Sequence, residues 1–281
     1  MPQYLSSLEK LLAVDVDSIA MRCRFGYYDY IIAGSGIGGG ILAEQLVQKK
    51  KRVLLIEKGG PLFSTHILNC PRPDYTRGKD DSQEGNEIIY AAVKQTIQTA
   101  ENSEPYVGGP IYCLGGRSNV WGLWIPQAYT TTLSDYFPPA VHSALTTDGW
   151  YTQAFNLLTN NSQQKKVYPD GNIDPGVLAA AVGDLTGALA DYIRPDSRVG
   201  IGPVATEFNS SAPYRFPQGA YSTTVSLMNR IYARDEFLTV LMHHECLDFE
   251  YPSPDTSLEN PTPGRCVYRL HSIMVLSNFS S

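Results

Sequence analysis

The chain has 281 residues, of which 43% are hydrophobic, and it carries a formal net charge of −6 at pH 7. This length and apolar content are ample for one large or two ordinary globular domains. The acidic balance argues against a nucleic-acid-binding surface, and no apolar run reaches the length of a membrane span. We therefore expect a soluble protein that binds neither nucleic acid nor a membrane.

The cysteines lie at scattered positions, 23, 70, 113, 246 and 266, and no two of them form a C-x-x-C pair. An odd, dispersed set is typical of reduced thiols, and it predicts neither a disulfide framework nor a zinc site. The N-terminal residues also lack the pattern of a signal peptide. From these features we predict a cytoplasmic location.

A short apolar run, Tyr30 to Ala33, predicts a strand that is buried on both faces of a parallel sheet. The sequence G-x-G-x-x-G follows directly. In this motif the first glycine lets the chain turn off the strand, the second lets a diphosphate approach the backbone, and the third lets a helix pack closely on the sheet. Backbone N–H groups and the positive end of the helix dipole are the expected anion ligands. The predicted phosphate site covers Gly34, Ser35, Gly36, Ile37, Gly38 and Gly39.

The predicted helix continues to the basic run Lys49 to Arg52, and a second strand follows at Val53 to Ile56. Glu57 ends this strand about twenty residues past the glycines, where a carboxylate can accept hydrogen bonds from a ribose diol. Strand, glycine turn, helix, strand and acid in this order predict a site for an adenine dinucleotide. A glycine-rich turn that binds no ligand is the alternative, but it does not explain why the acid stands at the ribose position.

Glu57 favours an adenosine ribose without a 2′-phosphate, because a second negative charge would be repelled. NAD and FAD both meet this condition. The next residues, Lys58-Gly59-Gly60, give an E-x-G-G ending that is similar to that of FAD-binding Rossmann domains. This similarity favours FAD and adds Lys58 to the predicted site, while an NAD-linked dehydrogenase stays as an alternative because both cofactors share the adenosine half.

A second glycine-rich stretch runs from Gly108 to Pro126, after a predicted surface loop at Pro61 to Gly85 and a predicted helix at Ile88 to Thr99. Its backbone can pass very close to a flat, charged ligand, and its small hydroxyl and amide side chains can hydrogen-bond phosphate or the edge of a flavin. A glycine-rich turn with packed tryptophans is the alternative. Because the stretch follows a nucleotide-binding unit, we predict cofactor contacts at Gly115, Gly116, Ser118 and Asn119.

The remaining half of the chain gives coarser signals. Helices are predicted at Trp150–Leu158, at Pro175–Tyr192 and within Arg215–Arg234, and strands at Phe237–Leu241, Cys246–Tyr251 and Arg265–Leu270. His243, His244 and Glu245 are adjacent in sequence, and neighbouring side chains on a strand point to opposite faces. They cannot easily share one ion, so we predict no metal site.

The two glycine-rich stretches together resemble the glucose-methanol-choline (GMC) oxidoreductases, FAD enzymes that oxidise alcohols and sugars. That family pairs an N-terminal G-x-G-x-x-G and E-x-G-G with a later G-G-x-S/T, which Gly115-Gly116-Arg117-Ser118 would supply here. Trp121-Gly122 departs from the asparagine-glycine of many members and is similar to the pyranose-oxidase branch. In that branch a histidine bonded to the flavin precedes the tryptophan, whereas this chain has Val120. The resemblance therefore implies FAD that is held non-covalently.

The resemblance also implies an α/β fold, in which a Rossmann-type FAD-binding domain is combined with a discontinuous second α+β substrate domain and is C-terminally incomplete. The implied parts are an N-terminal extension at 1–27, a first FAD-binding part at 28–135, a substrate-binding domain at 136–236 and a return to the FAD-binding domain at 237–281. It places the backbone of Cys246 against the adenine ring.

The implied reaction is hydride transfer from an alcohol or sugar to the flavin, which then passes electrons to oxygen, a quinone or another acceptor. The substrate-facing histidine of the family and its C-terminal FAD strand are not found before Ser281, so we expect the chain to match only the N-terminal portion of a member. A truncated, catalytically inactive FAD-binding remnant is the alternative. We assign no catalytic residue, because nothing around His142, His243, His244 or His271 distinguishes any of them as a base.

Overall fold

The computed structural model describes residues 15–70, 89–104, 106, 108–128, 130–159, 175–191, 204–205, 219–250 and 267–272. The chain forms two compact units, one made of Met1–Val120 with Ser222–Ser281 and the other of Trp121–Tyr221.

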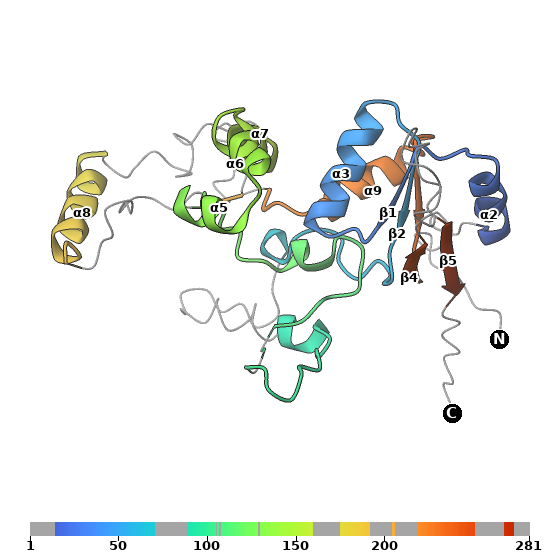
Figure 1. The fold of residues 1–281 in the computed structure, drawn as a ribbon, viewed down its shortest axis with the longest axis horizontal. Helices are drawn as coiled ribbons and strands as arrows, with labels where there is room; N and C mark the ends of the chain where they lie inside the picture. Colours follow the sequence, from blue (N-terminus) through green and yellow to red (C-terminus); the bar gives the residue numbers. More distant parts are fainter. Residues whose placement is uncertain are drawn as a thin grey trace. The chain divides into compact units, whose positions relative to one another are not determined.

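A parallel sheet of three strands lies at the centre of the first unit (Figure 1). Its strands are β1 (Tyr30–Ala33), β2 (Val53–Ile56) and β3 (Leu238–Leu241), in that order across the sheet. Ile32 of β1 pairs with Leu55, which pairs in turn with Val240 of β3. Every residue of the middle strand is buried, which explains why its sequence is a continuous apolar run rather than an alternation.

Helices cover both faces of this sheet (Figure 1). On one face, α3 (Ile37–Gln48) and α9 (Thr223–Tyr232) pack their apolar side chains against Val53, Leu55 and Val240. On the other face, Ile19 of α2 (Val16–Arg24) packs against Leu54, Ile56 and Leu241. Successive residues of β2 thus face different helices, as the two-residue period of a strand requires.

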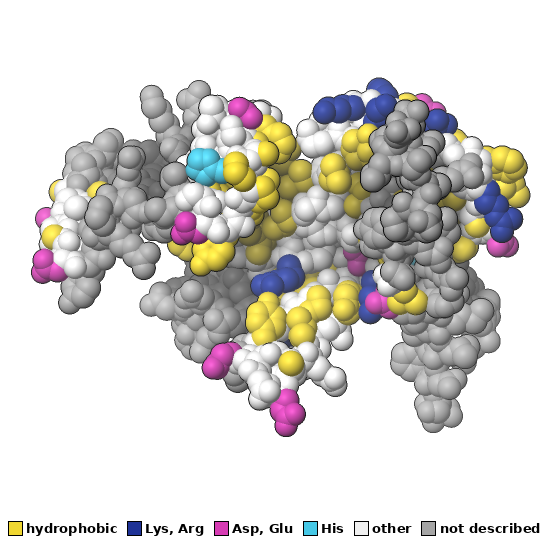
Figure 2. Space-filling view, viewed as in Figure 1, with side chains coloured by type: hydrophobic (Ala, Val, Ile, Leu, Met, Phe, Trp, Pro, Cys, Tyr) yellow, Lys and Arg dark blue, Asp and Glu magenta, His cyan; other side chains and the backbone are white. Residues whose placement is uncertain are grey.

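The C-terminal end of α3 is basic. Lys49, Lys50 and Lys51 are exposed where the helix ends, and Figure 2 shows lysine and arginine side chains gathered there. Positive charge at a helix C-terminus complements the negative end of the helix dipole. The opposite, N-terminal end of α3 is the positive end of the dipole and attracts anions.

Two further strands, β4 (His244–Glu250) and β5 (Val267–Ser272), form an antiparallel pair with an irregularity between Cys246 and Phe249. Two short 3-10 turns, η1 (Ile67–Asn69) and η2 (Gly116–Asn119), also belong to this unit, as do the helical residues 89–93.

The second unit is helical in the part that the structure describes, with α5 (Thr130–Tyr136), α6 (Pro139–Thr146), α7 (Trp150–Leu158) and α8 (Pro175–Ala188). A small apolar cluster of Leu123, Ala205 and Ala220 forms its buried centre, next to an isolated bridge between Trp124 and Val204. None of the helices in the described part of the chain is both long and apolar enough to cross a membrane.

Several sequence predictions can be compared with these elements. The strands at 30–33 and 53–56 have the predicted bounds. The prediction that the first of them is buried on both faces is wrong, because β1 is the first strand in the order β1-β2-β3 and Tyr30 and Ala33 are exposed. β3 begins one residue later and β4 two residues earlier than predicted. The helix predicted over Ile88–Thr99 is wrong beyond residue 93, where the helical residues end. The helix ends there because the Gln95 N–H donates to the Pro110 carbonyl at 2.8 Å instead of to a carbonyl of the preceding helical turn. The C-terminal end of the predicted Pro175–Tyr192 helix also falls short, at Ala188.

The predicted domain boundaries, after residues 135 and 236, stay predictions, and the compact units divide the chain elsewhere. The predicted boundary after residue 236 differs from the boundary between the compact units because α9 packs in the first unit. This helix was predicted within the substrate-binding part, yet Leu227 and Met228 lie in the same apolar core as Ala43 and Val47 of α3.

Candidate functional site

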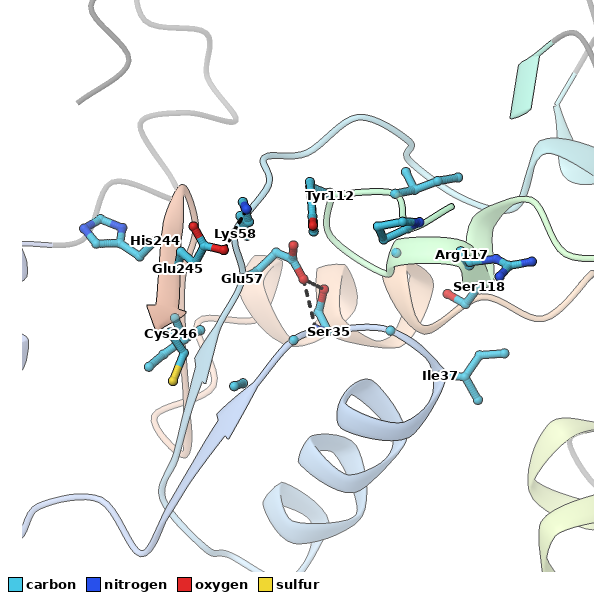
Figure 3. A pocket seen from close by; sticks show the side chains of 17 residues that line it. Ser35, Ile37, Glu57, Lys58, Tyr112, Arg117, Ser118, His244, Glu245 and Cys246 are labelled. Carbon is cyan, nitrogen blue, oxygen red and sulfur yellow. Dashed lines mark hydrogen bonds and ion pairs between the residues drawn. The ribbon is translucent and has the colours of Figure 1, made fainter. Parts of the chain in front are cut away.

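A cleft of about 460 Å³ lies in the first unit at the carboxyl ends of β1 and β2 (Figure 3). Ala33 and Ile56, the last residues of the two strands, form part of its wall. The carboxyl ends of parallel strands are where ligands bind in open α/β sheets, and this volume lies within the common range for ligand sites.

The glycine turn between β1 and α3 forms one wall of the cleft. Gly34 has a φ of +86°, which an L side chain rarely adopts, and its N–H donates to the Ile56 carbonyl at 2.7 Å. A Cβ at Gly36 would meet no atom within 4 Å, whereas a Cβ at Gly39 would collide with the Gly34 carbonyl oxygen. The third glycine is therefore needed for packing, and the second keeps open the space beside the start of α3.

The N-terminal end of α3 faces this open space. Gly36 is its N-cap, no side chain caps the helix, and its first turn contains no acidic residue. The first N–H groups of a helix have no partner within the helix, and the helix dipole makes this end attractive to negative charge. The arrangement can hold an anion with backbone groups alone.

Glu57 is only 5% exposed, and its carboxylate is oriented from both sides (Figure 3). Oε2 accepts hydrogen bonds from the Ser35 N–H at 3.0 Å and from the Ser35 hydroxyl at 2.5 Å, and Oε1 accepts one from the Gly59 N–H at 2.9 Å. A carboxylate oxygen can accept about two hydrogen bonds, so Oε1 keeps acceptor capacity toward the cleft.

The second glycine segment lies against the first. Gly115 and Gly116 both have positive φ, +82° and +50°, and a Cβ on Gly116 would lie 3.4 Å from the Cα of Gly36. A Cβ on Gly115 would collide with the Thr224 hydroxyl. Glycine is needed at both positions, for the backbone conformation and, at Gly115, for the close approach to α9.

Ser118 and Asn119 are completely buried, and their side chains are hydrogen-bonded to other groups of the protein. The Ser118 hydroxyl donates to the Gly115 carbonyl at 2.5 Å and accepts from the Thr223 N–H at 3.1 Å. The Asn119 amide donates to the Leu114 carbonyl at 2.8 Å and accepts from the Ser222 hydroxyl at 2.6 Å. These bonds hold η2 against the start of α9.

Besides Glu57, charged side chains are found at two places in the wall. Lys58 Nζ lies 2.7 Å from Glu245 Oε1 and 4.2 Å from the centre of the Tyr112 ring, and the hydrogen bond to Glu245 raises the pKa of Lys58. Arg117 also lines the cleft, with its Nη1 3.5 Å from the Tyr106 hydroxyl. Figure 3 shows Arg117 and the Lys58–Glu245 pair on opposite sides of Glu57.

The structure brings most of the sequence-predicted residues to this one cleft. Those in its wall are Gly34, Ser35, Gly36, Ile37, Glu57, Lys58, Gly116, Ser118 and Cys246. The other four, Gly38, Gly39, Gly115 and Asn119, lie outside the wall.

Sequence reasoning missed several wall residues, namely Pro110, Ile111, Tyr112, Arg117, His244 and Glu245. Gly59 and Gly60 could have indicated that another segment, the one around Tyr112, packs closely on this part of the chain. A Cβ on Gly59 would collide with the Tyr112 carbonyl, and Gly60 forms a parallel bridge with Cys113. The two glycines of E-x-G-G thus allow the second glycine-rich stretch to approach the end of β2.

The histidines give no catalytic assignment. His66 is buried and its Nδ1 accepts from the Leu68 N–H, while His142 is half-buried on α6, outside the cleft wall. His244 lines the cleft, but its Nδ1 is bonded to the Met242 carbonyl at 2.7 Å. Among the residues that the structure describes, no three His, Cys, Asp or Glu side chains are grouped to hold a metal ion. The side chain of His271 lies outside the described residues.

No protein-family model matches the chain. Among solved structures, it is similar to a fungal aryl-alcohol oxidase, with 16% sequence identity and a TM-score of 0.45 over 87% of this chain. A formate oxidase from Aspergillus oryzae RIB40, studied for its FAD modification, gives 12% identity and a TM-score of 0.43 over 80% of this chain. A pyridoxine 4-oxidase from Mesorbium loti gives 14% and 0.42, also over 80%. The chain spans 42%, 40% and 44% of the lengths of these three structures.

Proposed function

We propose that the chain binds FAD non-covalently in this cleft and acts as an oxidoreductase of GMC type on a small alcohol or sugar. One observation carries the proposal. Open space beside Gly36, at the N-terminus of α3, lies in the same cleft as the buried carboxylate of Glu57. The first suits a diphosphate and the second suits a ribose diol.

The shape of the cleft fits the order of groups in an adenine dinucleotide. Figure 3 shows Cys246 and Arg117 on opposite sides of Glu57. In our proposal the adenine lies on the Cys246 side, the ribose at Glu57 and the diphosphate along Gly34–Ile37, so the flavin half extends toward Gly116 and Ser118.

The proposal assigns this chain the work of binding and orientation. The backbone N–H groups of the glycine turn would hold the diphosphate, and Glu57 would fix the ribose. Val120 has no group that could bond covalently to a flavin, which supports non-covalent binding. FAD, when bound, supplies the hydride acceptor of the reaction. We assign no residue of this chain as the base.

The proposal is tested by adding FAD to the purified 281-residue chain, removing free flavin and then adding alcohols and sugars without oxygen. Bound flavin that bleaches with one of these compounds supports the oxidoreductase. Bound flavin that never bleaches would support a binding-only protein. Colourless protein that produces reduced nicotinamide fluorescence would instead support an NAD-linked dehydrogenase.

A further inference from the structure

Ser35 joins three segments at the centre of the cleft. It is completely buried, and its hydroxyl donates to Glu57 Oε2 at 2.5 Å while it accepts from the Gly115 N–H at 2.9 Å. Its carbonyl accepts from the Thr223 hydroxyl at 2.8 Å. One small side chain therefore connects the turn after β1, the end of β2 and the second glycine segment.

The contacts of Ser35 determine how Glu57 faces the cleft. The last torsion of a glutamate side chain has broad preferences, so hydrogen bonds are needed to fix the plane of its carboxylate. Ser35 donates two hydrogen bonds to Oε2, from its N–H and its hydroxyl, and the Gly59 N–H donates one to Oε1. Oε2 thus already accepts two hydrogen bonds, whereas Oε1 accepts one and can accept a second from a ligand.

We infer that Ser35 is a positioning residue that orients Glu57 to accept a hydrogen bond from the 2′-hydroxyl of the ligand's ribose. It thereby sets the preference of the cleft for ribose over 2′-deoxyribose. This inference rests on the proposed function, because it requires an adenine nucleotide in the cleft.

Serine suits this position because its hydroxyl is donor and acceptor at once. In Ser35→Ala, Glu57 Oε2 loses the hydrogen bond from the Ser35 hydroxyl, and the buried Gly115 N–H loses that hydroxyl as its acceptor. The carboxylate then keeps only two backbone donors, the N–H of residue 35 and that of Gly59. Its plane is held less firmly, so Oε1 is presented less often in the orientation that a ribose needs. Affinity for a nucleotide with no 2′-hydroxyl should change much less.

The test measures binding of ADP and of 2′-deoxy-ADP to the whole chain by titration calorimetry. Wild-type protein should prefer ADP by about tenfold, the effect expected for one hydrogen bond to a charged group. In Ser35→Ala this preference should fall to about twofold. In Glu57→Gln it should fall at least as far, and adding Ser35→Ala to Glu57→Gln should lower it no further.

Ser222→Ala is the matched control. Ser222 is also a buried serine with a short hydroxyl bond, 2.6 Å to Asn119 Oδ1, but it does not contact Glu57 and lies outside the cleft wall. A loss of stability alone should act alike in both serine variants, so Ser222→Ala should keep the preference for ADP. If Ser35→Ala does not fold, Ser35→Cys, with a similar volume and a weak donor, allows the same comparison.

Each outcome has a defined meaning. An unchanged preference in Ser35→Ala or Ser35→Cys would overturn the positioning role, even if both nucleotides bound more weakly. Wild-type protein that binds both nucleotides equally would overturn the ribose contact while the nucleotide site survived. Wild-type protein that binds neither would overturn the proposed function and this inference together.

Discussion

Gly36 and Gly39 lie three residues apart, yet an added side chain would meet opposite surroundings at the two positions. A methyl group at Gly36 would enter open space, and one at Gly39 would collide with the carbonyl oxygen of Gly34. Gly36→Ala should therefore stay within about 1 kcal/mol of wild-type stability, because only the N-cap preference changes. Gly39→Ala should lose about 1–3 kcal/mol or more, as overpacking does. Urea unfolding of both variants measures the difference, and equal losses would contradict the geometry of the turn.

Lys58 and Arg117 are positively charged residues in the cleft wall. Lys58 is paired with Glu245, whereas among the described residues no carboxylate lies within ion-pair distance of Arg117. Because arginine binds phosphate strongly, Arg117→Ala should weaken ADP binding by about tenfold and leave adenosine binding unchanged. Arg117→Lys keeps the charge and should retain most of the affinity for ADP. Titration with the two ligands checks this. Equal losses for ADP and adenosine would show that Arg117 does not contact a phosphate group.

The contact between α3 and α9 depends on charge as well as on apolar packing. Arg230 of α9 donates to Glu44 of α3 at 2.8 Å and to Asp235 at 2.7 Å. Burial alone would raise the pKa of Asp235, but the Phe237 N–H and the Arg230 guanidinium outweigh burial and hold this pKa below its usual value. The hydrogen bond to Glu44 in turn raises the pKa of Arg230.

A pH dependence follows from the lowered pKa of Asp235. Its stabilising contribution is fully present above the ordinary aspartate pKa, 3.8, and is lost as the pH falls through the lowered folded-state pKa. Asp235→Asn should therefore cost about 1 kcal/mol of unfolding free energy at pH 6 and progressively less below pH ~4. Denaturant unfolding across this range measures it. A variant whose deficit grew toward acid would contradict the assigned direction.

At the level of elements, local patterns predicted what local forces determine. The strands at 30–33 and 53–56 and the glycine turn follow from a short apolar run and from backbone geometry, so their sequence signals are nearly sufficient. The contacts of Ser118 with Thr223 could not be predicted, because they join residues 105 positions apart. The helix predicted to Thr99 ended early for a similar reason, since Gln95 bonds to the distant Pro110 carbonyl.

The accessibility of the cysteine thiols shows whether the first unit as a whole is folded. Cys113 is completely buried in the bridge to Gly60, and burial raises its pKa to about 11, whereas Cys70 is exposed. Thiolates are the reactive species, so iodoacetamide at pH 8 should label Cys70 in the native protein and Cys113 only when the first unit unfolds. Peptide mass mapping over time separates the two sites. Equal labelling rates under native conditions would contradict the packing of Cys113.

The central claim concerns the cleft of the first unit, which combines residues from both sequence segments of that unit, Met1–Val120 and Ser222–Ser281. Equilibrium dialysis of FAD against the wild-type chain and Gly36→Val tests it most directly, since the valine side chain would occupy the open space assigned to the diphosphate. We predict about one FAD per wild-type chain and loss of that binding in Gly36→Val, with both proteins folded. Wild-type protein that takes up no FAD, or a folded Gly36→Val that binds it equally well, would contradict the account.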